Sequence, residues 1–197
     1  MHRQTIESYD AGAKRWRETR RPESPDAAPI DSNAAAFRAR VGPGLVLDLG
    51  CGPGAALNSL NPDAVGIDAS LAMLELVDRR VVAAPLIAAD IEALPLVDGC
   101  ASGAFGSFSF QHLPRDQFVD ALDEVYRVLR AGGLLELWMH AVPGTDGVRQ
   151  NDDMGIGRWF TYWSADELAD VLPRSGFEVL LIDDDQEFAR RTLARRP

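Results

Sequence analysis

Apolar positions along the chain recur at two spacings, and each spacing predicts a different kind of element. Ile6, Tyr9, Ala13 and Trp16 lie three or four residues apart, which predicts a surface helix over roughly residues 3–20. Short continuous apolar runs follow further along, and such a run is typical of a strand covered on both faces. Because runs and helical stripes alternate, we expect a parallel sheet with helices on both of its faces.

Capping residues and turn residues set the limits of these elements. Strands are predicted over about residues 45–49, 64–68, 85–89, 102–109, 134–140, 177–182 and 188–193, with the third and fourth central and the last at an edge. Helices are predicted over about residues 3–20, 31 or 32 to 42, 71–77 and 118–131. A short helix is also predicted between the glycines and residue 60, and a last helix starts at about residue 165 and is expected to end early at Pro173.

The length and composition of the chain predict a single domain. The 197 residues, 46% of them hydrophobic, suffice for one core, so we expect one domain over residues 1–197. Residues 1–30 are interpreted as a helix and a proline-containing surface linker (20–29), and residues 31–197 as the body. The segment 142–163 is interpreted as a short loop, and its glycines favour mobility.

The charge balance excludes some classes of partner. With 30 acidic and 20 basic residues the formal net charge is -10, which disfavours a nucleic-acid partner. A terminal group of arginines (Arg190, Arg191, Arg195 and Arg196) follows a run of acids, so we interpret it as a solvated edge.

Cysteine usage and hydropathy predict a cytoplasmic setting. Cys51 and Cys100 are too few for a disulfide framework, and neither lies in a pair spaced for a metal. We expect no metal site. The N-terminal segment lacks the apolar core of a signal peptide and no apolar stretch approaches a membrane span, so no membrane partner is expected.

A glycine-rich segment after the first predicted strand carries the main functional signal. Residues 46–54 read Val-Leu-Asp-Leu-Gly-Cys-Gly-Pro-Gly, and glycines at a strand end let the backbone turn tightly and approach a ligand. Asp48, Asp68 and Asp90 fall at or near the ends of three successive strands. An ionised carboxylate only accepts hydrogen bonds, so these three favour a ligand with hydroxyls, amines or positive charge over a phosphate-rich one.

Five motifs in this order resemble those of the class I S-adenosylmethionine-dependent methyltransferases, especially the small-molecule enzymes of type 11. They are the segments 46–54, 66–74, 89–96, 111–114 and 124–133. The resemblance covers about residues 40–183. It implies a Rossmann-like fold with a mostly parallel seven-stranded sheet and an antiparallel last strand.

The resemblance assigns a role to each matching residue. It implies that the backbone of Gly50, Cys51 and Gly52 faces the methionine and ribose of S-adenosyl-L-methionine. Asp48 is expected near the amino group of that cofactor. Asp68, with Ala69 after it, is expected at the ribose hydroxyls. The adenine is expected at Asp90, the amide of Ile91 and the side chain of Met73, and the sulfonium at Ser107 and Phe108.

Each carboxylate also has a plain structural alternative. Asp48 can cap the glycine turn, Asp68 can be an ordinary acid at a helix start, and Asp90 can be a loop carboxylate. Met73 can equally be a core residue. The chain also departs from the family, which commonly has Phe-Asp where residues 101–102 read Ala-Ser and a paired histidine where residues 111–112 read Gln-His.

The acceptor site is the least determined part of the sequence. His112 and His140 are the candidate bases, needed only if the acceptor must lose a proton, and for His112 a structural hydrogen bond is the favoured alternative. Tyr9, Trp16, Trp159 and Tyr162 are aromatic candidates for a small-molecule acceptor, in two segments (1–30 and 142–163) that resemble the family's lid. They can equally pack the first helix against the body.

Two other functions stay open at this point. Gly50, Gly52 and Ala55 also fit the G-x-G-x-x-G/A pattern of an NAD(P)-dependent Rossmann oxidoreductase, although Asp48 would then lie close to a pyrophosphate. A non-catalytic domain that binds the cofactor or a partner is the other. The sequence is compatible with a monomer or a homodimer.

Overall fold

The computed structural model describes residues 3–19, 27–150, 157–186 and 189–197. The helices are α1 Arg3–Thr19, α2 Ala27–Val41, α3 Leu57–Leu60, α4 Leu71–Glu75, the short 3₁₀ helix η1 Phe110–His112, α5 Arg115–Val128 and α6 Ala165–Arg174. The strands are β1 Val46–Leu49, β2 Ala64–Asp68, β3 Leu86–Ala88, β4 Ala101–Ser107, β5 Leu129–His140, β6 Gly147–Arg149, β7 Arg158–Phe160, β8 Glu178–Gln186 and β9 Ala189–Arg195.

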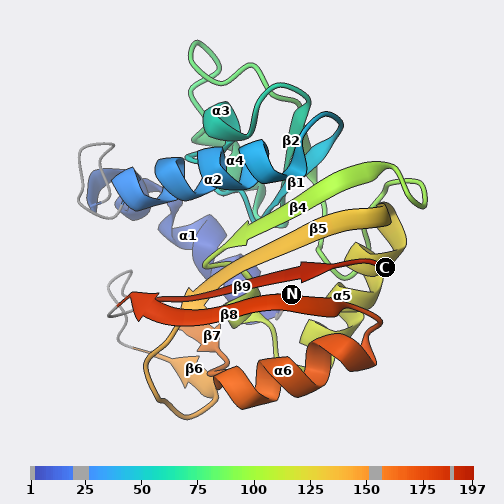
Figure 1. The fold of residues 1–197 in the computed structure, drawn as a ribbon. Coiled ribbons are helices and arrows are strands. Elements are labelled where there is room, and N and C mark those ends of the chain that lie inside the picture. Colours follow the sequence, from blue (N-terminus) through green and yellow to red (C-terminus); the bar gives the residue numbers. More distant parts are fainter. Residues whose placement is uncertain (1–2, 20–26, 151–156, 187–188) are drawn as a thin grey trace.

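Seven of the strands form one sheet in the order β3-β2-β1-β4-β5-β9-β8 (Figure 1). The first five of these pair in parallel, whereas β9 runs antiparallel to both β5 and β8. The predicted fold class, a mostly parallel seven-stranded sheet with helices on both faces and an antiparallel last strand, is confirmed.

Two predicted strand positions are wrong. The last strand, predicted over 188–193 at an edge, lies between β5 and β8, and its residue 188 is outside the described residues. Strands β8 and β9 are joined by a short connection and therefore pair as antiparallel neighbours, which leaves β8 at the edge. At the other side β3, predicted to be central, is the edge strand.

Helices cover the two faces of the sheet in separate groups. Apolar side chains of α5 and α6 form one core with one face, and those of α2 and α3 form a second core with the other face (Figure 1). The glycines that weakened the prediction of β4 make room for this packing. A Cβ at Gly103 would lie 3.1 Å from the ring of Phe37, and one at Gly106 would lie 2.9 Å from the ring of Phe110.

Several helix ends differ from their predicted positions. Helix α2 begins at Ala27 rather than at Asp31 or Ser32, because Pro29 lies in its first turn, where no N–H donor is needed. Helix α5 ends at Val128 and β5 starts at Leu129, so the strand takes up residues that were predicted to be helix.

Pro173 does not end the last helix early. It lies inside α6, with Arg174 the only helical residue after it. A proline this close to the end removes little of the helical hydrogen bonding.

The terminal arginines are only partly a solvated edge. Arg190 is 6% exposed and donates to both oxygens of Asp184, at 2.5 and 2.8 Å, and Arg191 pairs with Glu136 at 2.8 Å. The predicted solvated edge is therefore wrong for these two residues. They are covered because β9 lies inside the sheet, with strands on both sides.

The segment 142–163 contains a strand pair as well as loop. Strands β6 and β7 pair antiparallel within it, and residues 151–156 are outside the described ranges. Helix α1 and this pair lie at the carboxyl ends of β4 and β5 (Figure 1). Within the described ranges, no helix combines the length and the apolar character that crossing a membrane requires.

Candidate functional site

A tight backbone turn follows β1. Gly50 and Gly52 have φ angles of 73° and 51°, in the left-handed region that favours glycine. The amides of Gly50 and Cys51 both donate to the carbonyl of Ile67 in β2, at 2.8 and 3.0 Å. A Cβ at Gly50 would lie 2.3 Å from the Cβ of Ser109, so only glycine fits at this position.

Asp68, at the end of β2, links that turn to the start of α4. One carboxylate oxygen accepts from the amide of Gly52 and the other from the amide of Ser70, both at 2.8 Å. Burial raises the pKa of Asp68, the two backbone donors act against the rise, and the charges of Asp10 and Asp90 add to it. The two amides therefore fix the position of the carboxylate. Its raised pKa means that a further positive group or hydrogen-bond donor would stabilise its ionised form.

The side chain of Asp48 is buried and incompletely hydrogen-bonded within the described residues. It is 2% exposed, and its Oδ2 atom is buried with no hydrogen-bond partner in the described part of the chain. Burial, with the charge of Asp68, raises the pKa of Asp48 to about 8. A buried carboxyl in this condition is stabilised by a hydrogen-bond donor or a cation supplied by a ligand.

Cys51 lies between these two acids and is not a nucleophile. Burial raises the pKa of its thiol, and the charges of Asp48 and Asp68 raise it further. Because the thiolate is the reactive form of cysteine, the raised pKa disfavours nucleophilic reactivity. The neutral thiol donates to the Gly52 carbonyl at 3.7 Å.

A cavity of about 720 Å³ opens over the turn and both acids. Eleven predicted site residues line it: Asp48, Gly50, Cys51, Gly52, Asp68, Met73, Ser107, Phe108, Tyr9, Trp16 and His112. The structure therefore brings together the strand-tip acids, the glycines and part of the aromatic set. Its volume is typical of a site for a small ligand.

Six other predicted site residues are not among those that line this cavity. Three of them are cofactor candidates, namely Ala69, which follows Asp68, and Asp90 and Ile91, which were predicted for the adenine. The Asp90 charge acts on Asp68. The other three are His140, Trp159 and Tyr162. Tyr162 is 7% exposed, and Trp159 makes hydrogen bonds to the side chains of His112, Thr5 and Thr161.

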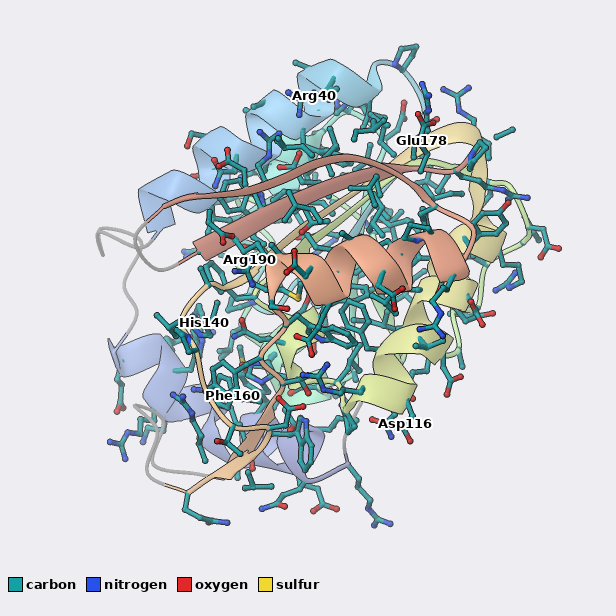
Figure 2. All side chains as sticks on the ribbon, turned by 60° about the horizontal axis from the view of Figure 1, so that its bottom comes forward. Arg40, Asp116, His140, Phe160, Glu178 and Arg190 are labelled. Atoms are coloured by element: carbon teal, nitrogen blue, oxygen red, sulfur yellow. The ribbon has the colours of Figure 1, made fainter. Side chains whose placement is uncertain are left out.

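His140 contacts the cavity through another residue. Its ring packs on Phe108, with the ring centroids 5.3 Å apart, and on Phe160 of β7, with the centroids 6.0 Å apart. Figure 2 shows where His140 and Phe160 lie. Phe108 has a φ of 55°, a conformation that a bulky residue rarely adopts. Such strain is typical of a functional site, and it points to Phe108 as a residue that the fold holds in place.

His112 is fully engaged in hydrogen bonds. Its Nδ1 atom lies 2.7 Å from the carbonyl oxygen of Trp159, and its Nε2 atom lies 2.9 Å from the hydroxyl of Tyr9. The guanidinium of Arg158 donates to that same hydroxyl at 2.7 Å. The structural hydrogen bond considered for His112 is therefore present, on the wall of the cavity.

Sequence reasoning missed several residues in and around this site, among them Asp10, Ser109 and Arg158. Asp10 of α1 accepts from the Ser70 hydroxyl at 2.5 Å and joins α1 to the start of α4. Ser109 packs against Gly50 and donates to the Leu49 carbonyl at 2.6 Å. Arg158 is 4% exposed. Nothing in the local pattern marks them; only the position of Asp10 next to Tyr9 was a usable signal.

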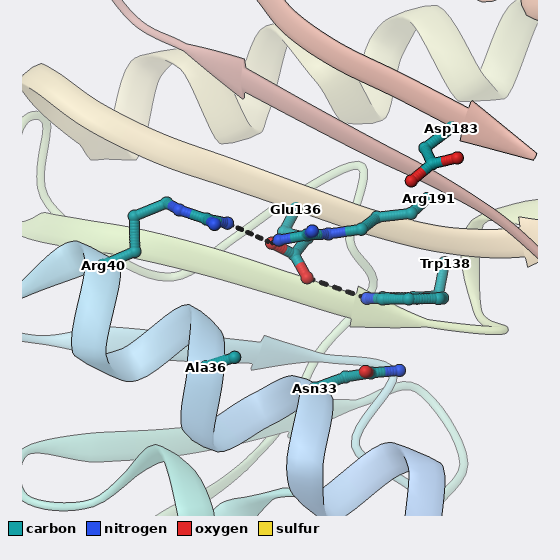
Figure 3. A pocket seen from close by; sticks show the side chains of 7 residues that line it. All are labelled: Asn33, Ala36, Arg40, Glu136, Trp138, Asp183 and Arg191. Atoms are coloured by element: carbon teal, nitrogen blue, oxygen red, sulfur yellow. Dashed lines mark hydrogen bonds and ion pairs between the residues drawn. The ribbon is translucent and has the colours of Figure 1, made fainter. Parts of the chain in front are cut away.

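A second, smaller cavity of about 210 Å³ lies away from the glycine turn, between α2 and strands β5, β8 and β9 (Figure 3). At its centre Glu136, 0% exposed, accepts from Arg191 and from the indole of Trp138 at 2.8 and 2.9 Å, with Arg40 at 3.5 Å. None of the predicted site residues lines it. These contacts bind α2 to the sheet.

Comparison with known proteins finds similarity over the segment that holds the glycine turn and the strand-tip acids. Residues 46–133 match the family described as "Methyltransferase domain". A malonyl-[acyl-carrier protein] O-methyltransferase of Enterobacter lignolyticus is 33% identical over 108 residues, which are 53% of this chain and 42% of that protein. The chain thus spans less than half the length of this curated relative.

Two solved structures have a similar fold. The DhpI-SAM-HEP complex gives a TM-score of 0.77 at 23% identity and covers 99% of each chain. The 1,6-didemethyltoxoflavin-N1-methyltransferase of Burkholderia thailandensis, solved with 1,6-didemethyltoxoflavin and S-adenosylhomocysteine, gives 0.72 at 17% identity over 97% of this chain and 84% of that one. At such identities the likeness concerns the fold.

Proposed function

We propose that the chain is a class I S-adenosylmethionine-dependent methyltransferase, since residues 46–133 match the methyltransferase domain family, and that it transfers a methyl group to a small-molecule acceptor. The observation that carries the proposal is the unpartnered Oδ2 atom of Asp48, buried beside Asp68 on the cavity wall. This pair of acids favours a cationic, phosphate-free ligand and disfavours a dinucleotide, whose pyrophosphate would meet like charge.

The residues of the cavity fit S-adenosyl-L-methionine. Asp48 would hold the ammonium group, directly or through water, and Asp68 would accept from the ribose hydroxyls. Gly50, Cys51 and Gly52 line the cavity, and the positive φ angles of the two glycines shape the turn that presents their backbone. Met73 would pack on the purine. When bound, the sulfonium supplies the methyl group and leaves as a neutral thioether.

The predicted adenine contacts stay part of this proposal. Asp90, with Ala69, lies at the strand ends next to Asp68, and Ile91 is 1% exposed, so its amide is held in a fixed place. The protein's contribution to methyl transfer is chiefly alignment and exclusion of water. Ser107 and Phe108 would border the reacting methyl group.

The volume of the cavity supports a small acceptor. Its volume of about 720 Å³ must hold the cofactor as well as the acceptor. One structure of similar fold points the same way, since it holds 1,6-didemethyltoxoflavin, whereas the curated relative is named for malonyl-[acyl-carrier protein]. Tyr9 and Trp16 line the cavity and would contact an apolar or flat acceptor.

Helix α1 and the β6–β7 pair would act together as the lid. The Ser8 hydroxyl donates to the carbonyl of Gly157 at 2.5 Å, and the amide of Trp159 donates to Thr5 at 3.0 Å. Asp10 ties the same helix to α4. Movement of α1 would therefore open the cavity and release the hairpin in one step.

Calorimetric titration with S-adenosylhomocysteine tests the cofactor site directly. The wild-type protein is expected to bind it, whereas Asp48→Asn and Asp68→Asn bind about tenfold or more weakly, because each loses a charge-assisted contact. Asp116→Asn, on the exposed start of α5, is the control and should bind normally. A broad acceptor screen that measures S-adenosylhomocysteine formation then tests transfer itself. Equal affinity in all four proteins would remove the basis of the proposal.

The two alternative functions predict different results. An NAD(P)-dependent oxidoreductase would bind NADH in the same titration and would not bind S-adenosylhomocysteine. A non-catalytic domain would bind the cofactor and show no turnover with any acceptor. We further expect no nucleic-acid or membrane partner, and a monomer or homodimer.

A further inference from the structure

The tautomer of His112 follows from its two hydrogen-bond partners. The carbonyl of Trp159 only accepts, so the Nδ1 atom facing it at 2.7 Å carries the proton. In the neutral ring Nε2 then has a lone pair, and the Tyr9 hydroxyl at 2.9 Å donates to it. The imidazole is thus oriented as a base, with a phenol as its immediate proton donor.

A cation lies next to the phenol oxygen of Tyr9. Arg158 donates to that oxygen at 2.7 Å, and its guanidinium lies 5.1 Å from the centre of the Tyr9 ring. Arginine stays charged in proteins, so it stabilises negative charge that develops on the oxygen. The arrangement favours movement of the Tyr9 proton toward His112, which is 2% exposed.

Tyr9 and His112 line the same cavity as Ser107 and Phe108. His112 Nε2 faces Tyr9, so an acceptor would reach this base through the Tyr9 hydroxyl. Arg158 of β7 faces the pair, and the other charged side chains that line the cavity are Arg17, Asp31, Asp48, Asp68 and Asp78. The chain therefore places a possible proton path where the acceptor would bind.

From this geometry we infer that Tyr9 and His112 form a proton relay for an acceptor with a phenolic or enolic hydroxyl, an inference that rests on the proposed methyl transfer. The acceptor hydroxyl passes its proton to the Tyr9 oxygen while the Tyr9 proton passes to His112 Nε2. The acceptor oxygen uses the freed electron pair to form its bond to the methyl carbon. The positive charge lost from sulfur thereby ends on the imidazolium, which the Trp159 carbonyl stabilises.

The acidity of the acceptor limits its class. Proton transfer between two groups is efficient when their pKa values are matched, and the ordinary pKa of a tyrosine hydroxyl is about 10. Phenols and enols lie in that range, whereas aliphatic alcohols are far less acidic. The aromatic wall formed by Tyr9 and Phe108 suits a flat acceptor of that kind. Tyr9 is the catalytic residue of the relay, and His112 is the group that accepts its proton.

The probe for this relay is 4-nitrophenol, whose phenolate absorbs visible light. It is titrated into the protein, with and without S-adenosylhomocysteine, at a pH where free 4-nitrophenol is mostly neutral. In the wild-type protein the bound probe is expected to show the phenolate band. His112→Asn keeps a donor for the Trp159 carbonyl but has no basic nitrogen, so the band is lost. Tyr9→Phe is expected to lose it as well.

Tyr126→Phe is the matched control, because Tyr126 packs on Phe177 of the core and lies outside the cavity. It should keep the phenolate band. With a hydroxyl acceptor from the screen, Tyr9→Phe and His112→Asn should lower kcat by about 10²- to 10⁴-fold, with unchanged affinity for S-adenosylhomocysteine.

Three results would overturn the relay: no binding of 4-nitrophenol, a neutral bound probe in the wild type, or a full phenolate band in His112→Asn. The last would show that Arg158 alone ionises the probe. These results are separable from failure of the methyltransferase proposal. If S-adenosylhomocysteine binds and the phenolate band is absent, only the relay is wrong.

Discussion

At the scale of single residues, two buried acids at strand ends dominate the site. Asp48 and Asp68 are held close together by the turn between β1 and β2, and burial raises the pKa of both. Charge of one sign is costly to bury without compensation. The fold keeps this arrangement because β1 and β2 are parallel neighbours whose carboxyl ends meet at one edge of the sheet.

The raised pKa of Asp48 predicts a pH dependence of stability. Its pKa is about 8 in the folded protein against 3.8 for the ordinary group, so between these values the folded state holds a proton that the unfolded state has lost. Stability therefore falls as pH rises through this window, by at most about 1.4 kcal/mol per pH unit. Urea unfolding at several pH values should show that Asp48→Asn removes this fall.

The exposed Asp120→Asn is the control and should follow the wild-type pH profile. If Asp48→Asn and the wild type lose stability in parallel as pH rises, Asp48 is already ionised in the free protein.

Gly50 makes a second prediction at this scale. Alanine there must adopt a φ of 73° and place its Cβ 2.3 Å from that of Ser109. We expect Gly50→Ala to lower the free energy of unfolding by about 2–4 kcal/mol, from backbone strain and collision together. Gly42 has nearly the same φ, 72°, with nothing within 4 Å of its added Cβ.

Gly42→Ala therefore isolates the cost of the backbone, which we expect to be about 1 kcal/mol. Chemical denaturation of both variants gives the comparison. Equal losses would mean that Ser109 moves aside without cost.

At the scale of elements, one buried carboxylate joins three of them. Glu136 of β5 contacts Arg191 of β9 and Arg40 of α2 (Figure 3). Removing a buried acid leaves its partners partly uncompensated. Both arginines reach solvent in part, so we expect a moderate loss for Glu136→Ala, about 1–3 kcal/mol of unfolding free energy.

The edge strand offers a matched control for this prediction. Glu178 of β8 pairs with Arg195 on the same sheet, with both side chains nearly half exposed. Such a pair contributes at most about 1 kcal/mol. Equal losses in Glu178→Ala and Glu136→Ala would show that burial of Glu136 adds nothing.

At the scale of the whole molecule, helix α1, the glycine turn and the strand-tip acids line one cavity, so a ligand bound there should stabilise the complete fold. At a concentration of 100 times its Kd, S-adenosylhomocysteine should add about 2.7 kcal/mol, which corresponds to a rise in Tm of about 5–10 °C. Thermal denaturation checks this value.

NADH at the same concentration should leave the Tm unchanged, since its pyrophosphate would meet Asp48 and Asp68. A rise with NADH and none with S-adenosylhomocysteine would reverse the assignment of the cofactor.

Much of the fold was predictable because apolar runs alternate with helical stripes along the chain, and clear capping and turn residues mark where these elements end. The Ser164–Glu167 capping box is present at the start of α6, for example. The errors lie where long-range contacts decide. The sequence of β9 resembles an edge strand because of its arginines, yet those arginines have partners, Asp184 and Glu136, on the two neighbouring strands.

The sequence alone determined the glycine turn, the acids at the strand ends and the α/β alternation. Each of these depends on the spacing of residues within a short segment, and that spacing sets the local backbone conformation. Only the tertiary structure decided that Tyr9, His112 and Arg158 meet at one wall of the cavity. Residues 9 and 158 belong to segments that are joined only through the folded body, and no spacing in the sequence records their contact. The proposed cofactor site therefore depends on residues grouped in local sequence motifs, and the proposed acceptor site depends on residues far apart in the sequence.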